Sequence, residues 1–256
     1  MNHLNPHPTG ASCPPVIMRW HDISRDPNSR AAREWRHDTV RGSSQSQTVE
    51  RIGRLRELCA GKKVLDIGCV AHYSDSAQQS EWLHRHLAES AAECLGVDIL
   101  EDDVLELQRR GFRVIAQDVL ATPIADTFDL IVCGEMIEHI SRPGDLFSSA
   151  AKMLRPDGRL LITTPNPWYV GYILKAMFPQ RFLPVSVDHV AWYDAPTLAE
   201  LAERNGFALT GHQGLVNTHH VTMRARLAFW LTRILQLAGC SPSLSCRSCL
   251  YEFRLA

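Results

Sequence analysis

The chain has 256 residues, a formal net charge of −1 and 45% hydrophobic residues. This length and hydrophobic content suit one α/β domain with a full core and some additional segments. The balanced charge excludes a DNA partner and disfavours RNA, because tracking a phosphate backbone requires a basic groove. No run reaches the roughly 18 apolar residues that cross a bilayer. The start, Met1 to Pro8, shows no secretory signal, and we expect a cytoplasmic protein.

The first 44 residues are rich in Pro, Ser, Asn and Arg. This composition predicts an irregular or partly helical N-terminal arm over residues 1–44 rather than an independent domain. One domain is expected over residues 45–256. Its first element is predicted to be a helix that starts near Gln47, because apolar side chains then recur at helical spacing until Gly61 stops the pattern.

After this helix, short apolar runs alternate with helical patterns. Strand patterns cover residues 63–67, 94–98, 112–116, 128–133, 159–164, 207–210 and 249–255. Helical patterns cover residues 81–92, 104–110, 145–154 and 195–204. This alternation predicts a doubly wound α/β fold, with a mostly parallel seven-stranded sheet that helices cover on both faces. The last run alternates apolar and polar residues, which predicts an edge strand.

Acidic residues follow three successive strand patterns, at the edge where parallel sheets bind ligands. Asp66 ends the first strand, and Gly68 then allows a backbone turn without a Cβ against a ligand. Asp98 ends the second strand, where it can accept hydrogen bonds from a ribose diol. Asp118 follows the third strand and is a candidate for holding an adenine amino group. These acids together predict a nucleoside-binding pocket.

The segments 64–69, 96–99, 117–119 and 128–135 resemble successive motifs of class I S-adenosylmethionine-dependent methyltransferases, in an order that covers residues 49–213. The resemblance implies a Rossmann-like fold with an antiparallel last strand and S-adenosylmethionine as cofactor. The residues that match its cofactor motifs are Asp66, Gly68, Cys69, Asp98, Ile99, Asp118, Val119, Gly134 and Glu135. The chain departs from the family's glycine-rich loop, because Val70 and His72 stand where further glycines are usual. These side chains also disfavour a dehydrogenase, whose pyrophosphate needs close backbone approach.

The segment after the fourth strand carries Glu135, Glu138 and His139, which would share one face of a helix. This Glu-x-x-Glu-His motif resembles the corresponding motif of ubiquinone-biosynthesis O-methyltransferases and of small-RNA 2′-O-methyltransferases. In the RNA enzymes such a string, with a later His, binds a divalent metal that activates the acceptor hydroxyl. His189 matches the later His, so the resemblance implies a site for Mg²⁺ or Mn²⁺ formed by these four residues.

A competing interpretation of the same segment needs no metal. In it, Glu135 orients the cofactor and Glu138 is a charge on the surface of a helix. His139 or His189 alone then acts as the catalytic base that takes the proton of an acceptor hydroxyl. His84, within the predicted helix 81–92, is expected on a helix surface.

Two insertions leave the carboxyl edge of the predicted sheet, at about residues 165–194 and 214–248, and we expect both to cover the acceptor. Their aromatic and apolar side chains fit a lid over a small-molecule pocket, while packing onto the domain explains most of them. Residues 224–237 pair arginines with large apolar side chains, which is also typical of a peripheral membrane contact. Cys240, Cys246 and Cys249 form a loose cluster with one C-x-x-C pair, and a zinc site there would need further ligands at matching spacing.

The sequence therefore predicts an S-adenosylmethionine-dependent methyltransferase, with O-methylation of a small-molecule or sugar-containing (glycan) acceptor as its reaction. Two alternatives remain open at this point. One is a metal-dependent RNA 2′-O-methyltransferase, which the balanced charge disfavours. The other is a module that binds the cofactor and has lost transfer.

Overall fold

The computed structural model describes residues 18–70, 82–177, 186–216, 234 and 242–256. The strands are β1 (Ser44–Glu50), β2 (Lys63–Ile67), β3 (Glu93–Asp98), β4 (Val114–Ala116), β5 (Phe128–Gly134), β6 (Leu154–Pro165), β7 (Phe207–Val216) and β8 (Ser248–Leu255). The helices are α1 (Trp20–Ile23), α2 (Arg30–Ser43), α3 (Arg51–Cys59), α4 (Leu83–Ser90), α5 (Glu101–Arg109), α6 (Pro143–Met153), α7 (Val170–Ala176) and α8 (Ala195–Arg204). Two short 3₁₀ helices are η2 (Ile137–His139) and η4 (Pro242–Ser245).

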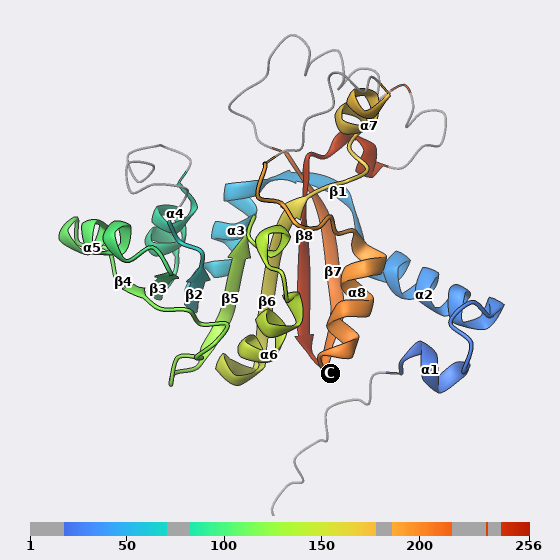
Figure 1. The fold of residues 1–256 in the computed structure, drawn as a ribbon, viewed down its shortest axis with the longest axis horizontal. Coiled ribbons are helices and arrows are strands. Elements are labelled where there is room, and N and C mark those ends of the chain that lie inside the picture. Colours follow the sequence, from blue (N-terminus) through green and yellow to red (C-terminus); the bar gives the residue numbers. More distant parts are fainter. Residues whose placement is uncertain (1–17, 71–81, 178–185, 217–233, 235–241) are drawn as a thin grey trace, which may run out of the picture.

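Within these described residues, the strands form one sheet in the order β1-β7-β8-β6-β5-β2-β3-β4, with helices on both faces (Figure 1). Every neighbouring pair is parallel except those that β8 makes with β6 and β7. The predicted doubly wound sheet with an antiparallel last strand is therefore confirmed. The sheet has eight strands, however, where the sequence patterns predicted seven.

The position of β8 was predicted wrongly, because this strand lies inside the sheet between β6 and β7. Its alternating pattern reflects two covered faces rather than one exposed face. Tyr251 and Phe253 pack into the core on one side, and Leu250 packs into the core on the other. Glu252 is only 8% exposed, and Arg159 binds its carboxylate at 2.9 Å. An ion pair thus allows a charged side chain in an interior strand.

The predicted helix near Gln47 is wrong in its first part, because residues 44–50 form strand β1, which pairs with β7 in parallel. The helix α3 starts only at Arg51. Glu50 separates the two elements, since its carboxylate accepts hydrogen bonds from the N–H groups of Ile52, at 3.0 Å, and Gly53, at 2.5 Å. Such a side-chain cap satisfies backbone donors that have no partner within the helix.

Two hydrophobic clusters cover the two faces of the sheet. In β2, Leu65 and Ile67 pack with α6 and α8 on one face, whereas Val64 packs with α3 and α4 on the other. This alternation follows from the two-residue period of a strand. It leaves the carboxyl ends of β2, β3, β4 and β5 together at one edge of the sheet, where a ligand can reach them.

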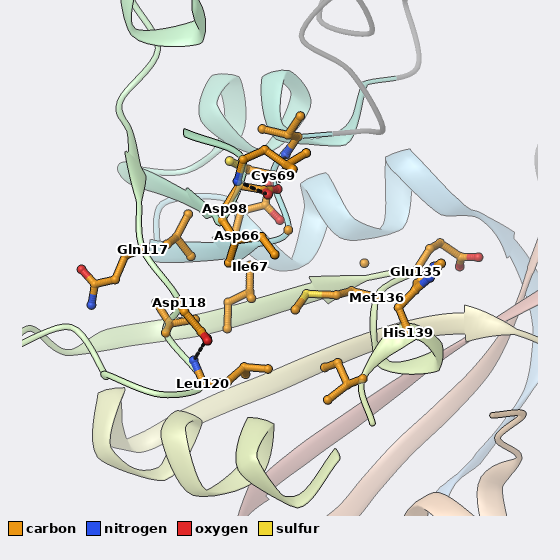
Figure 2. A pocket seen from close by; sticks show the side chains of 18 of the residues that line it. Asp66, Ile67, Cys69, Asp98, Gln117, Asp118, Leu120, Glu135, Met136 and His139 are labelled. Atoms are coloured by element: carbon orange, nitrogen blue, oxygen red, sulfur yellow. Dashed lines mark hydrogen bonds between the residues drawn. The ribbon is translucent and has the colours of Figure 1, made fainter. Parts of the chain in front are cut away.

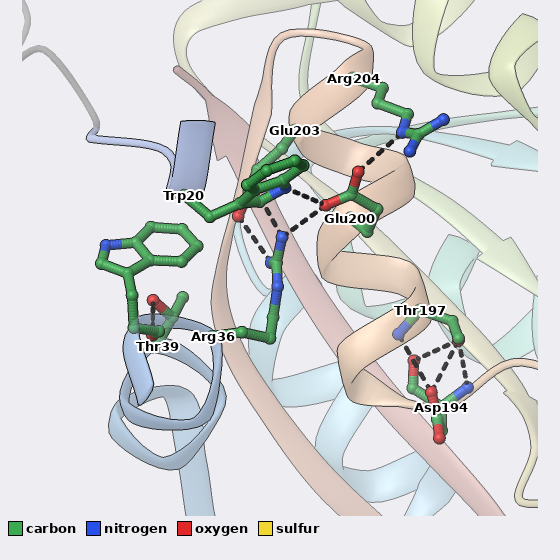
Figure 3. A network of polar contacts seen from close by, with 9 residues as sticks. Trp20, Arg36, Thr39, Asp194, Thr197, Glu200, Glu203 and Arg204 are labelled. Carbon is green, nitrogen blue, oxygen red and sulfur yellow. Dashed lines mark hydrogen bonds and ion pairs between the residues drawn. The ribbon is translucent and has the colours of Figure 1, made fainter. Parts of the chain in front are cut away.

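The N-terminal arm is helical in its described part and packs against α8 (Figure 3). The guanidinium of Arg36 binds the carboxylates of Glu203 and Glu200, each at 2.7 Å. The indole N–H of Trp20 donates a further hydrogen bond of 2.9 Å to Glu200. These polar contacts fasten α1 and α2 to the domain.

Several predictions fall on residues that the structure does not describe. The proposed membrane contact at residues 224–237 lies outside the described part apart from Ile234, and so do His72 and Cys240. The first insertion is described at residues 165–177 and 186–194, and most of the second is not. In the part of the chain that the structure describes, no helix combines the length and the apolar character required to cross a membrane.

Candidate active site

A cavity of about 760 Å³ lies at the carboxyl ends of β2, β3 and β5 (Figure 2). All nine residues that were predicted to bind the cofactor line it. Figure 2 shows Gln117 and Asp118 on one side of the cavity and Glu135 and His139 on the other, with Asp66 and Asp98 between them. The volume and the polar groups at its ends fit an elongated small molecule.

Asp98 is held at the end of β3 by the backbone around it. Its Oδ2 accepts a hydrogen bond of 2.9 Å from the N–H of Val70, and its Oδ1 accepts one of 3.2 Å from the N–H of Leu100. Burial raises the pKa of Asp98, although these N–H groups act in the opposite direction. The carboxylate is therefore fixed in place at the cavity wall, as a ribose acceptor needs to be.

Asp118 and Ile99 lie farther along the same wall. The Oδ1 atom of Asp118 accepts hydrogen bonds from the N–H groups of Leu120, at 3.0 Å, and Ala121, at 3.2 Å. Ile99 is 68% exposed, which gives the cavity an apolar surface beside the acid. An apolar side chain next to a fixed carboxylate suits a planar base that carries an amino group.

Asp66 differs from Asp98 because its partner is another side chain. His84 Nδ1 lies 2.9 Å from Asp66 Oδ2, and the two residues are 1% and 2% exposed. The prediction that His84 lies on a helix surface is therefore wrong. The register of α4 turns this ring toward the sheet, where Gly96 has no Cβ to obstruct it.

The segment after β5 is not the helix that its charge pattern suggested. Glu135 has a φ of 53°, a left-handed conformation that is uncommon outside glycine. The chain turns there, and only residues 137–139 form a 3₁₀ helix. The shared helix face expected for Glu135, Glu138 and His139 does not exist. The Oε2 atom of Glu135 instead accepts a hydrogen bond of 3.3 Å from Ser248.

Three of the four predicted metal ligands nevertheless come together. Ligand atoms of Glu138, His139 and His189 all lie within 4.8 Å of one another, and Glu135 is not part of this group. The segment with His189 is held by two backbone hydrogen bonds to the carbonyl of Glu138. The two imidazole rings meet edge to face, with 4.7 Å between their centroids.

Burial and neighbouring charges shift the pKa values within this group. Glu138 is 1% exposed, so its interpretation as a surface charge is wrong. Burial raises the pKa of Glu138 to about 7, and the negative charge of Glu135 acts in the same direction. Burial lowers the pKa of His189, and His139 adds to this effect. Among the described residues, Glu138 Oε1 and His189 Nδ1 have no hydrogen-bond partner.

Two further residues at the site were missed by the sequence analysis. Arg51, at the start of α3, lines the cavity, and its buried Nε has no hydrogen-bond partner within the described chain. Asp188 also lines the cavity, and its Oδ2 lies 2.9 Å from His139 Nδ1. Arg51 was missed because it lies on a helix before β2, whereas the candidate residues were sought at the ends of strands. Asp188 stands next to His189, and this adjacency was the available signal.

Comparisons with known proteins identify the family of this chain. The sequence model of the methyltransferase domain family matches residues 28–212. The ubiquinone biosynthesis O-methyltransferase of Methylococcus capsulatus is 27% identical over 168 residues, which cover 61% of this chain and 67% of that protein. The enzyme of the same name from Neisseria meningitidis is 25% identical over 217 residues, which cover 78% of this chain and 89% of that protein.

Two solved structures share the fold at low sequence identity. The magnesium protoporphyrin IX methyltransferase of Synechocystis, which holds SAH, has a TM-score of 0.51 and 17% identity, covering 92% of this chain and 100% of that chain. An S-adenosylmethionine-dependent methyltransferase from Mesorhizobium loti has a TM-score of 0.50 and 19% identity, covering 79% of this chain and 96% of that chain. With its family model matched over more than half of its length, the chain belongs to the methyltransferase domain family and is an S-adenosylmethionine-dependent methyltransferase.

Proposed function

We propose that this methyltransferase acts on a hydroxyl group of a small-molecule or sugar-containing acceptor. The observation that carries the proposal is the position of His139. It lines the cavity that also holds Asp66 and Asp98, and it belongs to the group with Glu138 and His189. This position of His139 supports a catalytic site in which a group that can accept a proton borders the cavity proposed for the cofactor. The relatives from Methylococcus capsulatus and Neisseria meningitidis are both named as O-methyltransferases of ubiquinone biosynthesis. Their names support oxygen as the acceptor atom.

Different residues of the cavity would bind different parts of the cofactor. Asp98 would accept hydrogen bonds from the ribose hydroxyls, and Asp118 would hold the adenine amino group, with Ile99 against the ring. Arg51 has an unpartnered buried Nε and would bind the carboxylate of the methionine part. The bound cofactor supplies an electrophilic methyl group on a sulfonium. The protein then has to align an acceptor oxygen and remove its proton.

The group of Glu138, His139 and His189 suits proton removal. His139 is oriented by Asp188, which lies 2.9 Å from its Nδ1 and leaves Nε2 to face an acceptor or an ion. The buried Glu138 Oε1 and His189 Nδ1 have no hydrogen-bond partner among the described residues. Both atoms are therefore also suitable ligands for a divalent cation. Two imidazoles and one carboxylate favour Mn²⁺ over Mg²⁺, which prefers oxygen ligands. Such a cation would lower the pKa of an acceptor hydroxyl.

The test follows methyl transfer from tritium-labelled S-adenosylmethionine to phenols, a catechol, free sugars and a short RNA, with Mn²⁺, Mg²⁺ or a chelator. We expect transfer to a small hydroxyl acceptor, loss with the chelator and recovery with Mn²⁺. The variant His189→Ala should lose at least tenfold in kcat, because general base or metal activation contributes roughly that much or more. Its affinity for S-adenosylmethionine should stay unchanged.

The matched control is His37→Ala, which removes an imidazole that is largely exposed on α2 and should keep full activity. Transfer to RNA alone, or full activity of both His139→Ala and His189→Ala, would contradict the proposal. If activity survives chelation but falls in His139→Ala, the proposal of a hydroxyl acceptor would be retained and the proposed metal site would be rejected.

A further inference from the structure

The turn after β2 borders the cofactor cavity but lacks the repeated glycines that usually shape such a turn. It runs from Ile67 to Val70, all of which line the cavity. Gly68 has a φ of 77°, and its N–H donates a hydrogen bond of 2.9 Å to the carbonyl of Val97. Val70 occupies a position where glycine would be usual, so a side chain borders the cavity at this point of the turn.

Trp82 holds the part of the turn that follows Gly68. Its indole N–H donates a hydrogen bond of 2.8 Å to the carbonyl of Cys69. The indole is 3% exposed, and the ring of Phe112 packs edge to face against it, at 4.7 Å between centroids. A buried ring with one polar contact has little freedom to move, so the carbonyl that it binds is fixed as well.

His84 holds the part of the turn that precedes Gly68, through its contact of 2.9 Å with the carboxylate of Asp66. A buried carboxylate is costly without a hydrogen-bond partner, which ties the orientation of Asp66 to the ring of His84. On the side of Gly96 there is no spare room for this ring. A Cβ on Gly96 would lie 2.6 Å from His84 Cε1 and 2.8 Å from Cys69 Sγ.

We propose that Trp82 and His84 are positioning residues for the cofactor, which hold this turn through two side-chain hydrogen bonds. The two residues come from the start of α4 and bind on either side of Gly68. Any displacement of the turn breaks a buried hydrogen bond. The turn is thus preorganised for the cofactor before binding, and preorganisation raises affinity. The inference rests on cofactor binding alone and not on the identity of the acceptor.

The test compares substitutions that remove one hydrogen bond and keep the shape. In Trp82→Phe, the ring stays and the N–H is lost. We expect the Kd for S-adenosylmethionine to rise about tenfold, as for one buried hydrogen bond, with kcat at saturating cofactor within about twofold of the wild type. In His84→Asn, the amide replaces the Nδ1–H donor and should largely retain affinity, whereas His84→Leu should lose about tenfold or more. Calorimetry measures the Kd for S-adenosylmethionine, and steady-state kinetics measure KM and kcat separately.

The matched controls remove similar hydrogen bonds far from the turn. Trp20→Phe loses an indole N–H bond of 2.9 Å to Glu200, and His212→Asn alters a ring whose Nδ1 lies 3.0 Å from Ser43 Oγ. Neither should change the Kd for the cofactor. Wild-type affinity in Trp82→Phe would overturn the proposal, and so would equal losses in Trp82→Phe and Trp20→Phe. If His84→Leu does not fold, His84→Asn still tests the proposal. This variant keeps a hydrogen-bond donor, so a tenfold loss of affinity for the cofactor would reject the role of the hydrogen bond.

Discussion

The backbone N–H of Val190 donates a hydrogen bond of 2.9 Å to the carbonyl oxygen of Glu138. This contact joins the segment that follows α7 to the 3₁₀ turn after β5, and it places His189 beside His139. Because the bond involves only main-chain atoms, side chains of the site can be replaced one at a time without releasing the segment. The predictions below for Glu138 and Asp188 depend on this independence.

Asp98→Asn is expected to weaken cofactor binding by about tenfold to a hundredfold, since a hydrogen bond to a charged group contributes about 1.5–3 kcal/mol. The substituted amide keeps one acceptor oxygen but loses the charge that binds the N–H of Val70 and that would bind the ribose hydroxyls. Calorimetric titration with S-adenosylmethionine measures the change. Asp102→Asn, an exposed acid at the start of α5, is the control and should bind normally. Equal affinity of the two variants would remove Asp98 from the cofactor site.

The buried carboxyl of Glu138 predicts a pH dependence of stability in the metal-free protein. Its pKa is about 7 in the folded state and ordinarily 4.5. Between these values the native state binds more protons than the unfolded state, so the free energy of unfolding falls as pH rises. Glu138→Gln should therefore be more stable than the wild type above pH 7, by up to about 3 kcal/mol. The two proteins should converge near pH 4.5.

Urea unfolding in the presence of a chelator, between pH 4.5 and 8, checks this prediction. Glu89→Gln, an exposed acid on α4, should follow the wild-type curve throughout. A constant difference between Glu138→Gln and the wild type at every pH would contradict the shifted pKa. Such a result would assign the effect to packing alone.

Asp188→Asn is expected to weaken Mn²⁺ binding by about tenfold to a hundredfold, the usual effect of replacing the partner of a metal-ligating histidine. The Ser186 hydroxyl and His139 hold the pKa of Asp188 below its usual range, which keeps it ionised and able to orient the ring. Titration with Mn²⁺ followed by electron paramagnetic resonance provides the affinity. Asp157→Asn changes an exposed acid elsewhere and should leave it unaltered. Normal Mn²⁺ affinity in Asp188→Asn would count against the proposed metal site.

Arg36→Met is expected to lower the free energy of unfolding by about 3 kcal/mol, because it leaves the buried carboxylate of Glu203 without its partner. Glu203 is 4% exposed. The affinity for S-adenosylmethionine should not change, since the contact lies on α8, away from the cavity. Chemical unfolding together with cofactor titration separates the two effects. Arg33→Met, on the exposed side of α2, should be neutral, and equal stability of both variants would show that the arm adds nothing.

The strand ends around the cofactor could be predicted from sequence because they depend on local rules. Apolar runs identify buried parallel strands, and parallel strands end at the same edge of a sheet. Asp66, Gly68, Asp98 and Asp118 line one cavity for this reason, and the five further residues that the family resemblance implied line it with them. In contrast, β1 carries mostly polar side chains, from Ser44 to Thr48, and gains its strand conformation by pairing with β7. No pattern within residues 44–50 contains that information.

The contacts that complete the site depend on tertiary packing and escaped the sequence analysis. His84 turns inward because Gly96, on the neighbouring strand β3, leaves space for its ring. Arg51 reaches the cavity from a helix that precedes the first strand of the cofactor motif. The left-handed turn at Glu135 separates this residue from Glu138 and His139, although the three are close in sequence and carry suggestive charges.

The interior place of β8 has a consequence for how the molecule assembles. This strand follows every other described strand in chain order, yet it joins β6 to β7. During synthesis, the block of β4, β3, β2, β5 and β6 can form early, while β7 and β1 have no sheet to join. The open edge of β6 then exposes unpaired backbone groups, which are prone to pairing with other chains. We therefore expect the insertion of residues 248–255 to complete the sheet, and changes that slow this insertion should lower the yield of native protein before they affect its activity.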